Sequence, residues 1–270
     1  MHPSLGKTQT LKDDMDPARA EALQVVLGLD GPPLAHDTFL PPFFHHAYFW
    51  HVLPEDRLGR DGHPRLGGFI PDLGLPRRMW AGGRLRFLAP IRTCSPAAKI
   101  TTITRIEQKQ GRTGPLAFIT LSHEIRQSAR ACVIEEQDLV YRADPGPGEA
   151  APVPPEAAND EEEARRISFS PVTLFRYSAL TMNGHRIHYD LDYCRNVEGY
   201  PGLVVHGPLL AQHLIAIAAR ALGPLAQFTF RARAPLFQGE AASFCRRGDR
   251  LWVRGPDGRL CMEATAKSAE

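Results

Sequence analysis

Side chains that can transfer protons are concentrated in residues 183–190, which read Asn-Gly-His-Arg-Ile-His-Tyr-Asp. This segment holds two histidines, an amide and a carboxylate, which a buried pocket could gather around one water molecule. A histidine with its ordinary pKa of about 6.5 can take or give a proton near neutral pH. Local composition alone is equally compatible with a solvated loop, so the interpretation depends on the surrounding sequence.

A second segment, His206-Gly207, directly precedes an apolar run over 208–222 that stops at Gly223-Pro224. The run predicts a helix about 22 Å long that is surrounded by protein. Free N–H groups at its start favour negative charge, so Gly207 is a candidate donor to a developing thioester enolate, although close packing alone could also require a glycine there. Proton transfer would come from His188, and water would be added to, or removed from, an α,β-unsaturated thioester.

The elements around these segments are mostly strands. β-Branched and aromatic runs separated by glycine turns predict antiparallel meanders over 99–106, 116–125, 131–141, 228–233, 241–246, 251–254 and 260–266. An internal repeat relates 86–91 to 231–236 and 130–133 to 259–262. Two copies of one β-rich unit, with a sheet curled around a buried helix, correspond to the hot-dog architecture of the α+β class. A shorter helix is expected from Ser170-Pro171 to about Met182.

Proline and glutamate concentrate in residues 143–166, which predicts a linker. The acidic part of this segment is expected to be solvated. The predicted domains are therefore an N-terminal hot dog over 1–142 and a C-terminal, catalytic hot dog over 167–270.

Composition restricts the classes of function. The 32 Lys and Arg residues are spread along a chain with a net charge of +2, so no nucleic-acid partner is expected. The five cysteines form no Cys-x-x-Cys pair, and no disulfide framework or zinc site is indicated. No apolar leader or membrane-length segment is present, which predicts a cytoplasmic protein without a membrane partner. The adjacent His45 and His46 are expected to point apart, so no metal site is predicted in the aromatic segment 43–50.

Aligned on His188, the segment 183–190 resembles the hydratase motif Asp-x-Asn-Pro-x-His of the MaoC-like (R)-specific enoyl-CoA hydratases and 3-hydroxyacyl dehydratases. Asn183 stands where that family has Asp, His185 where it has Asn and Arg186 where it has Pro. The segment 205–209 is similar to the family's Ala-His-Gly-Met-Leu helix start.

Residues 177–190 resemble one branch in particular, which contains mitochondrial 3-hydroxyacyl-thioester dehydratases and bacterial mesaconyl-CoA and itaconyl-CoA hydratases. Segments 61–64, 67–71 and 76–83 look like the N-terminal domain of that branch, so the similarity extends from residue 40 to the end of the chain. The resemblance implies a double hot dog, with two antiparallel sheets each wrapped around a central helix. The N-terminal copy would lack the catalytic motif and help to bind substrate.

The Asn at position 183 requires a change in the family's mechanism, because an amide cannot act as a general base. We expect His188 to transfer the proton and Asn183 to hydrogen-bond the water, with His185 or Asp190 orienting His188. Alternatively, Asp190 only caps a turn. The expected substrate-binding residues, each of which could equally have a structural or solvated role, are Trp80, Arg84, Arg231, Arg233 and His206.

The predicted activity is the reversible hydration of an acyl-CoA thioester, with mesaconyl-CoA or itaconyl-CoA favoured as substrate. Coenzyme A belongs to the substrate, so no cofactor is expected, and the enzyme is predicted to be a homodimer. One alternative is a 3-hydroxyacyl-thioester dehydratase of fatty acid metabolism. Another is a hot-dog acyl-CoA thioesterase, against which Gln212 and His213 count because such enzymes place a carboxylate on this helix. A non-catalytic acyl-CoA-binding protein is the third alternative.

Overall fold

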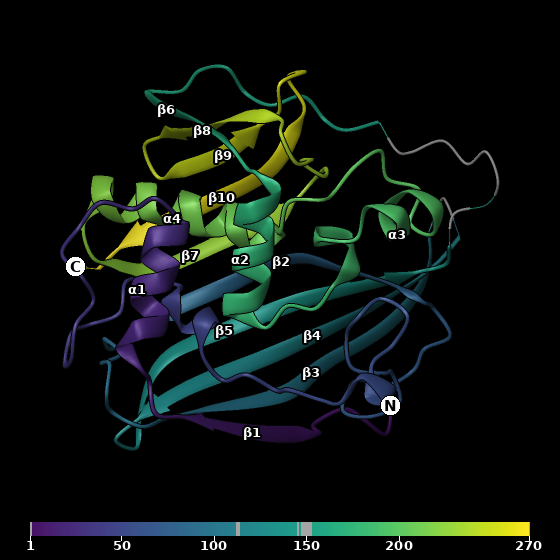
Figure 1. Ribbon diagram of the computed structural model, residues 1–270, viewed down its shortest axis with the longest axis horizontal. Helices are drawn as coiled ribbons and strands as arrows, with labels where there is room; N and C mark the ends of the chain where they lie inside the picture. The colour runs from purple at the N-terminus through teal and green to yellow at the C-terminus, as the bar shows by residue number, and fades with distance from the viewer. Residues whose placement is uncertain (1, 112–113, 145, 147–152, 270) are drawn as a thin grey trace.

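The computed structural model describes residues 2–111, 114–144, 146 and 153–269. Within them, ten strands form one antiparallel sheet in the order β1-β3-β4-β5-β2-β7-β10-β9-β8-β6 (Figure 1). The strands are β1 (Thr8–Asp13), β2 (Arg77–Phe87), β3 (Ala97–Gly111), β4 (Gly114–Gln127), β5 (Arg130–Arg142), β6 (Glu163–Ser168), β7 (Leu225–Ala232), β8 (Ala241–Arg247), β9 (Arg250–Arg254) and β10 (Leu260–Ser268). The helices are α1 (Pro17–Val26), α2 (Pro171–Thr181), α3 (Leu191–Asn196) and α4 (Gly207–Leu222), with 3-10 turns η1 (Phe44–Ala47), η2 (Glu55–Arg57) and η3 (Arg186–His188).

The two halves of the sheet repeat one unit, as the internal repeat predicted. Each half begins with an edge strand and a helix, β1 and α1 or β6 and α2, and ends with four further strands. The halves join where β2 pairs with β7. The repeat segments make the same hydrogen bonds: Leu88 N donates to Cys132 O at 2.8 Å, and Arg233 N donates to Cys261 O at 2.8 Å. The α+β class and the seven predicted strands are therefore confirmed.

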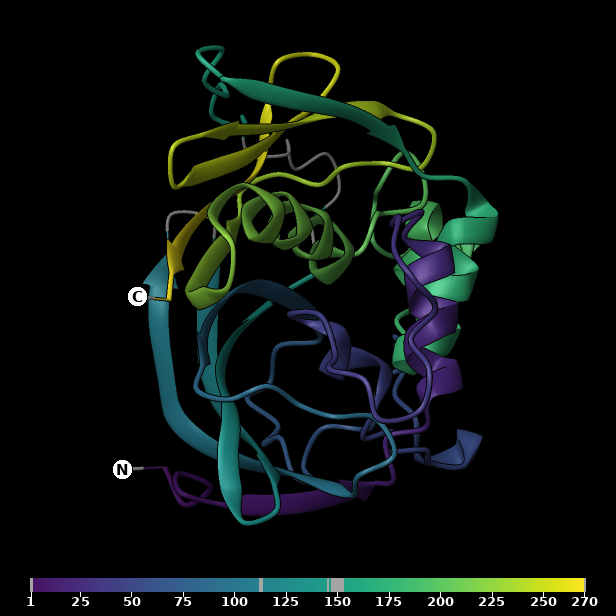
Figure 2. The same cartoon turned by 90° about the vertical axis from the view of Figure 1, so that its left-hand side faces the viewer.

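Helix α4 is the core of the C-terminal half. Pro208 occupies its first turn, and Gly223 ends it with a φ of 78°. Leu209, Ala211 and Leu214 are fully buried, and Figure 2 shows the helix enclosed by the strands of this half. The predicted buried helix is confirmed.

Among its described residues, the N-terminal half forms no helix comparable to α4, so the expectation of a central helix in each copy is wrong for the first one. Leu40 N donates to Ile91 O as Val205 N donates to Leu236 O, which makes the residues after Leu40 equivalent to the start of α4. Only the short turn η1 forms there. Loops then lead to β2, and Figure 2 shows them inside the curve of β3, β4 and β5.

The predicted linker is partly a strand, because β6 begins at Glu163 and pairs with β8. Its acidic residues are not simply solvated: Glu161 pairs with Arg254, and Glu162 and Glu163 pair with Arg246. The rest of the linker prediction falls in part on residues 145 and 147–152, outside the described residues. The division into two domains stays a prediction, since one sheet runs through both halves.

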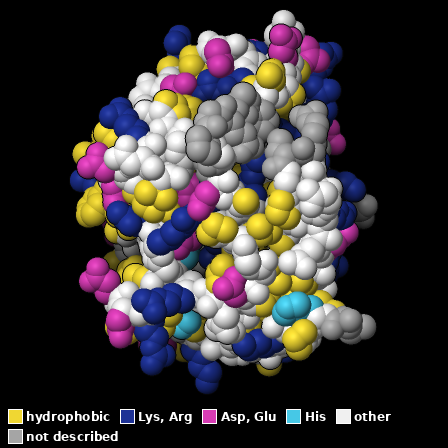
Figure 3. All heavy atoms as spheres, turned by 90° about the vertical axis from the view of Figure 1, so that its right-hand side faces the viewer, with side chains coloured by type: hydrophobic (Ala, Val, Ile, Leu, Met, Phe, Trp, Pro, Cys, Tyr) yellow, Lys and Arg dark blue, Asp and Glu magenta, His cyan; other side chains and the backbone are white. Residues whose placement is uncertain are grey.

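Charged side chains of both signs are scattered over the face shown in Figure 3. None of the helices in the described ranges is long and apolar enough to cross a membrane. The expectations about localisation and nucleic acid stay predictions.

Candidate active site

A cavity of about 360 Å³ lies where the two halves meet. Its lining includes Asn183, His185 and His188 from the C-terminal half, Gly207 from the start of α4, and Trp80 from β2. The structure therefore brings together the segment 183–190 and the helix start, as the sequence predicted.

The segment 183–190 is held from both halves. Helix α2 ends at Thr181, and the next residue, Met182, turns the chain with a φ of 49°. Asn183 N donates to Ser178 O at 2.9 Å. Arg186 N donates to the Asp61 carbonyl at 2.9 Å. A Cβ on Gly62 would lie 2.0 Å from the Gly184 carbonyl oxygen, so only glycine permits this close approach. The segment 61–64 thus has a positioning role that sequence reasoning did not identify.

His188 is held as a neutral base. Its Nδ1 donates to the Val204 carbonyl at 2.7 Å, because a carbonyl can only accept, and this leaves the lone pair of the neutral ring on Nε2. Burial lowers the pKa of His188 to about 4, against the opposing effect of the Val204 bond. The ring is therefore neutral at pH 7 and able to accept a proton.

His206 supports His188 and does not line the cavity. The two rings stack with centroids 3.6 Å apart, and His206 Nε2 is 2.8 Å from the Ser178 hydroxyl. The sequence predicted a direct substrate contact for His206. His206 does not line the cavity in this structure, so the structure gives it no such contact.

The other polar residues of the segment divide between the cavity and the surface. Asn183 Oδ1 accepts from His185 N at 3.2 Å, so the amide N–H groups remain for a water molecule. His185 Nε2 is buried without a hydrogen-bond partner in the described part of the chain, and burial, followed by the effect of His188, lowers the pKa of His185 to about 2. His185 is thus available to the substrate or the water as a neutral group.

Asp190 does not orient His188. Its carboxylate accepts from Tyr193 N at 2.9 Å, capping α3, and from Arg186 at 2.7 Å. The proposal that Asp190 orients His188 is therefore wrong and its alternative, a cap, is right. The Val204 carbonyl orients the imidazole instead.

Gly207 has space and a free donor. A Cβ there would meet only the Trp80 carbonyl, at 3.9 Å, so the chain's own packing does not demand glycine. Its N–H donates to no other group in the described ranges. Both observations favour the role of a donor to a bound oxyanion.

The predicted substrate-binding residues separate into two groups. Trp80 lines the cavity and donates from Nε1 to the Gly82 carbonyl at 2.9 Å, and Arg233 lines it while pairing with Glu263 at 2.9 Å. Arg84 lies outside, paired with Glu136 and Asp138 at 2.6 Å, and Arg231 lines a separate depression beside Trp252. Neither Arg84 nor Arg231 lines the cavity, so the structure gives neither a contact with a substrate bound there.

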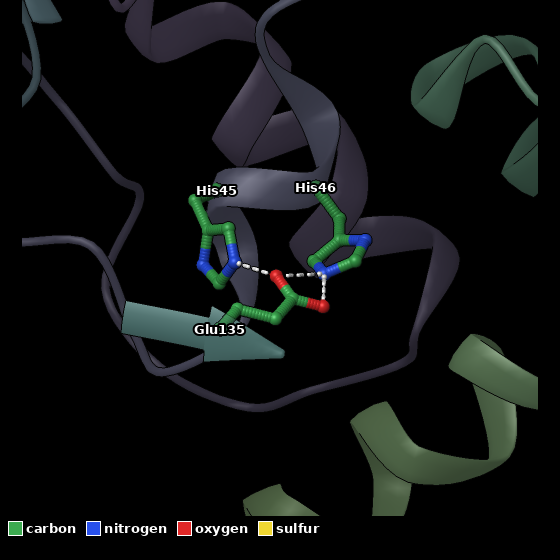
Figure 4. Close-up of side chains that lie close together, drawn as sticks. All are labelled: His45, His46 and Glu135. Carbon is green, nitrogen blue, oxygen red and sulfur yellow. Dashed lines mark hydrogen bonds and ion pairs between the residues drawn. The ribbon is translucent and has the colours of Figure 1, made fainter. Parts of the chain in front are cut away.

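The expectation that His45 and His46 point apart is wrong. Both rings reach Glu135 of β5 from the turn η1, at 2.8 and 3.1 Å (Figure 4). The long Glu135 side chain lies below the turn and presents one carboxylate to both rings. Burial opposes its charge, but contacts with His46 and His45 hold the pKa of Glu135 well below its usual range. The three ligating groups lie within 4.8 Å, and the carboxylate is already satisfied by hydrogen bonds.

The pKa of His188 predicts how activity depends on pH. The base must be neutral, and its pKa is lowered to about 4, so kcat/KM is expected to stay level from pH 7 to about pH 5 and to fall as the pH drops through about 4. An unfolded histidine takes up its proton near pH 6.5, so the fold also loses stability below that pH. Brief exposure in a stopped-flow pH jump, with circular dichroism as the control, separates the two effects. A midpoint near 6.5 would contradict the assignment of a buried, neutral base.

Comparisons with known proteins agree with this geometry. Residues 43–238 match the family model of hydroxyacyl-thioester dehydratase type 2. A mesaconyl-C(4)-CoA hydratase from Chloroflexus aurantiacus is 45% identical over 97% of this chain and 96% of its own. A mitochondrial hydroxyacyl-thioester dehydratase type 2 from Schizosaccharomyces pombe is 26% identical over 90% of this chain and 91% of its own.

Solved structures show the same fold. HtdX of Mycobacterium tuberculosis has a TM-score of 0.69 at 18% identity, covering 97% of this chain and 100% of that one. Another protein of that organism, described as having a double hotdog fold, has a TM-score of 0.58 at 14% identity, covering 97% and 95%. The predicted double hot-dog fold is confirmed, with its two expected sheets joined into one and without the central helix in the first copy among the described residues.

Proposed function

Since the chain belongs to the family of type 2 hydroxyacyl-thioester dehydratases, we propose that it adds water reversibly to mesaconyl-C4-CoA. It is a hydro-lyase of acyl thioesters. What we propose is that mesaconyl-C4-CoA is its substrate. The observation that carries the mechanism is the pair formed by His188, neutral with its lone pair on Nε2, and the free N–H of Gly207 in one cavity.

Each group has a defined part in the proposed reaction. The thioester oxygen accepts from Gly207 N–H, which stabilises the enolate that forms when the water oxygen bonds to the β carbon. His188 Nε2 takes the proton that this water loses and then returns it to the α carbon. Asn183 hydrogen-bonds the water. Because one base serves both steps, hydrogen and hydroxyl add to the same face. The proposed reaction uses no redox or organic cofactor.

A small dicarboxylyl thioester is favoured for two reasons. The chain is more similar to the mesaconyl-C(4)-CoA hydratase, at 45% identity, than to the yeast dehydratase, at 26%. In addition, the cavity lining includes Arg78 and Arg233 and, among the described residues, no Asp or Glu. Itaconyl-CoA and the 3-hydroxyacyl thioesters of fatty acid metabolism are the alternatives.

A thioesterase is the second candidate and is disfavoured. Water attack on the carbonyl would use a carboxylate on α4, where Gln212 instead accepts from the Tyr177 hydroxyl at 3.4 Å and His213 packs against Phe169 and Phe244. The homodimer stays a prediction, which the exposed Val25, Val172 and Phe175 of the contacting helices α1 and α2 favour.

Absorbance of the enoyl-thioester band tests the proposed function. The purified full chain is mixed in turn with mesaconyl-CoA, crotonyl-CoA and a longer enoyl-CoA, while a thiol reagent monitors free CoA. We expect the band to decay fastest with mesaconyl-CoA and without thiol release. Faster decay with the long enoyl-CoA would favour the fatty acid alternative, and thiol release with the band intact would favour the thioesterase.

A further inference from the structure

This inference rests on the proposed function. The proposed substrate carries a free carboxylate in addition to its thioester, next to the reacting double bond. In mesaconyl-C4-CoA this carboxylate is bonded to the β carbon, which receives the water. It must therefore enter the cavity together with the double bond. A carboxylate removed from water requires a cation or several donors around it.

Two arginines line the cavity, and they differ in their partners. Arg233 is exposed and already pairs with Glu263 at 2.9 Å. Arg78 is half-buried and makes no ion pair with any carboxylate of the described residues. This contrasts with its neighbours on β2, since Arg77 pairs with Glu198 at 2.7 Å and Arg84 pairs with two carboxylates.

Arg78 shares the cavity with His185 and His188. The residue lines both this cavity and an adjoining one of about 740 Å³, and His63 lines both as well. The His63 ring is 4.9 Å from His185, and His185 is 5.5 Å from His188, so a row of rings leads from this position to the base. After burial, the positive charge of Arg78 is the next cause that lowers the pKa of His63, and it also acts on His185.

No carboxylate of the described residues lines this cavity beside Arg78. Burial lowers the pKa of His185 to about 2 and also lowers that of His63, so both rings are neutral and can serve as hydrogen-bond partners without adding charge. Asp61 is close enough to act on Arg78 electrostatically, but it does not line the cavity.

We propose that the guanidinium of Arg78 binds the free carboxylate of the acyl group and so selects dicarboxylyl thioesters over neutral ones. Arginine suits this role because its planar fork donates two parallel hydrogen bonds to a carboxylate. Arg78 is then a specificity-determining residue of the active site, contributed by the N-terminal half to the base of the C-terminal half.

Calorimetric binding of two saturated analogues tests the proposal without turnover. Succinyl-CoA carries a carboxylate on its β carbon, and butyryl-CoA carries a methyl group there. We expect the wild-type chain to bind succinyl-CoA on the order of 100-fold more tightly than butyryl-CoA, and Arg78→Gln to remove most of this ratio while leaving butyryl-CoA affinity within about threefold. Arg84→Gln, a matched change on the same strand outside the cavity, should keep the wild-type ratio.

Arg78→Lys keeps a charge but loses the fork, and its ratio should fall about tenfold, which maintains the test if the Gln variant folds poorly. An unchanged ratio in the Arg78 variants, or an equal loss for both analogues, would overturn the proposal. These outcomes are separate from the fate of the proposed function, which depends on whether the wild-type chain hydrates mesaconyl-CoA.

Discussion

Replacing His188 by alanine is expected to lower kcat/KM on the order of 10³-fold or more. The reason is that His188 is the base that the cavity presents with its proton position fixed, through the 2.7 Å bond from Nδ1 to the Val204 carbonyl. No Asp or Glu of the described chain lines the cavity to replace it. The measurement is the initial rate of enoyl-thioester decay across substrate concentrations.

Two further variants make this result specific. His188→Gln can keep a donor toward Val204 but cannot take up a proton, so it should be equally inactive with a smaller loss of stability. His36→Ala removes an exposed histidine that does not line the cavity and should leave the rate unchanged. An active His188→Ala variant, combined with a strong gain in activity for Asn183→Asp, would contradict the single-base mechanism.

Replacing Gly207 by valine is expected to lower kcat on the order of 100-fold with little change in Tm. The side chain would enter space that the chain itself leaves open, since only the Trp80 carbonyl lies near, at 3.9 Å. It would therefore displace the thioester oxygen from the Gly207 N–H without disturbing the core. Steady-state kinetics and thermal unfolding, measured together, check both parts.

Gly202→Val is the matched control, because Gly202 lies in the loop that leads to α4 and does not line the cavity. A Cβ at Gly202 would meet no atom of the described residues within 4 Å, so the added side chain has room. The kcat of this variant should equal that of the wild type. A Gly207→Val enzyme with wild-type kcat would show that the start of α4 does not hold the oxyanion. A large drop in its Tm would instead assign Gly207 a packing role.

The grouping of the candidate site residues was predictable from sequence because it depends on local patterns. The run 183–190, the apolar helix after Gly207 and the repeated strand ends each carry their own signal. The missing helix of the N-terminal half was not predictable in the same way. Residues 43–50 are aromatic enough to predict packing, yet they form only the turn η1, followed by loops.

The partners of the site residues were less predictable, because they are set by tertiary contacts. The group that orients His188 is a backbone carbonyl, which every residue offers. The sequence pointed instead to the side chains of His185 or Asp190, and Asp190 was wrong. Likewise, an arginine's sequence position does not say whether a carboxylate faces it. Arg84 lies opposite Glu136 in the strand register, whereas Arg78 lies opposite Tyr141 and has no carboxylate at that position.

The product formed from mesaconyl-CoA in D₂O tests the central claim most directly. If His188 adds water across the double bond, NMR will show one deuteron on the α carbon and a hydroxyl group on the β carbon, with the thioester intact. The same product should be undetectable with the His188→Ala variant. Release of free CoA with an unlabelled, still unsaturated acid would contradict the account, as would an equal yield of hydrated product from the variant.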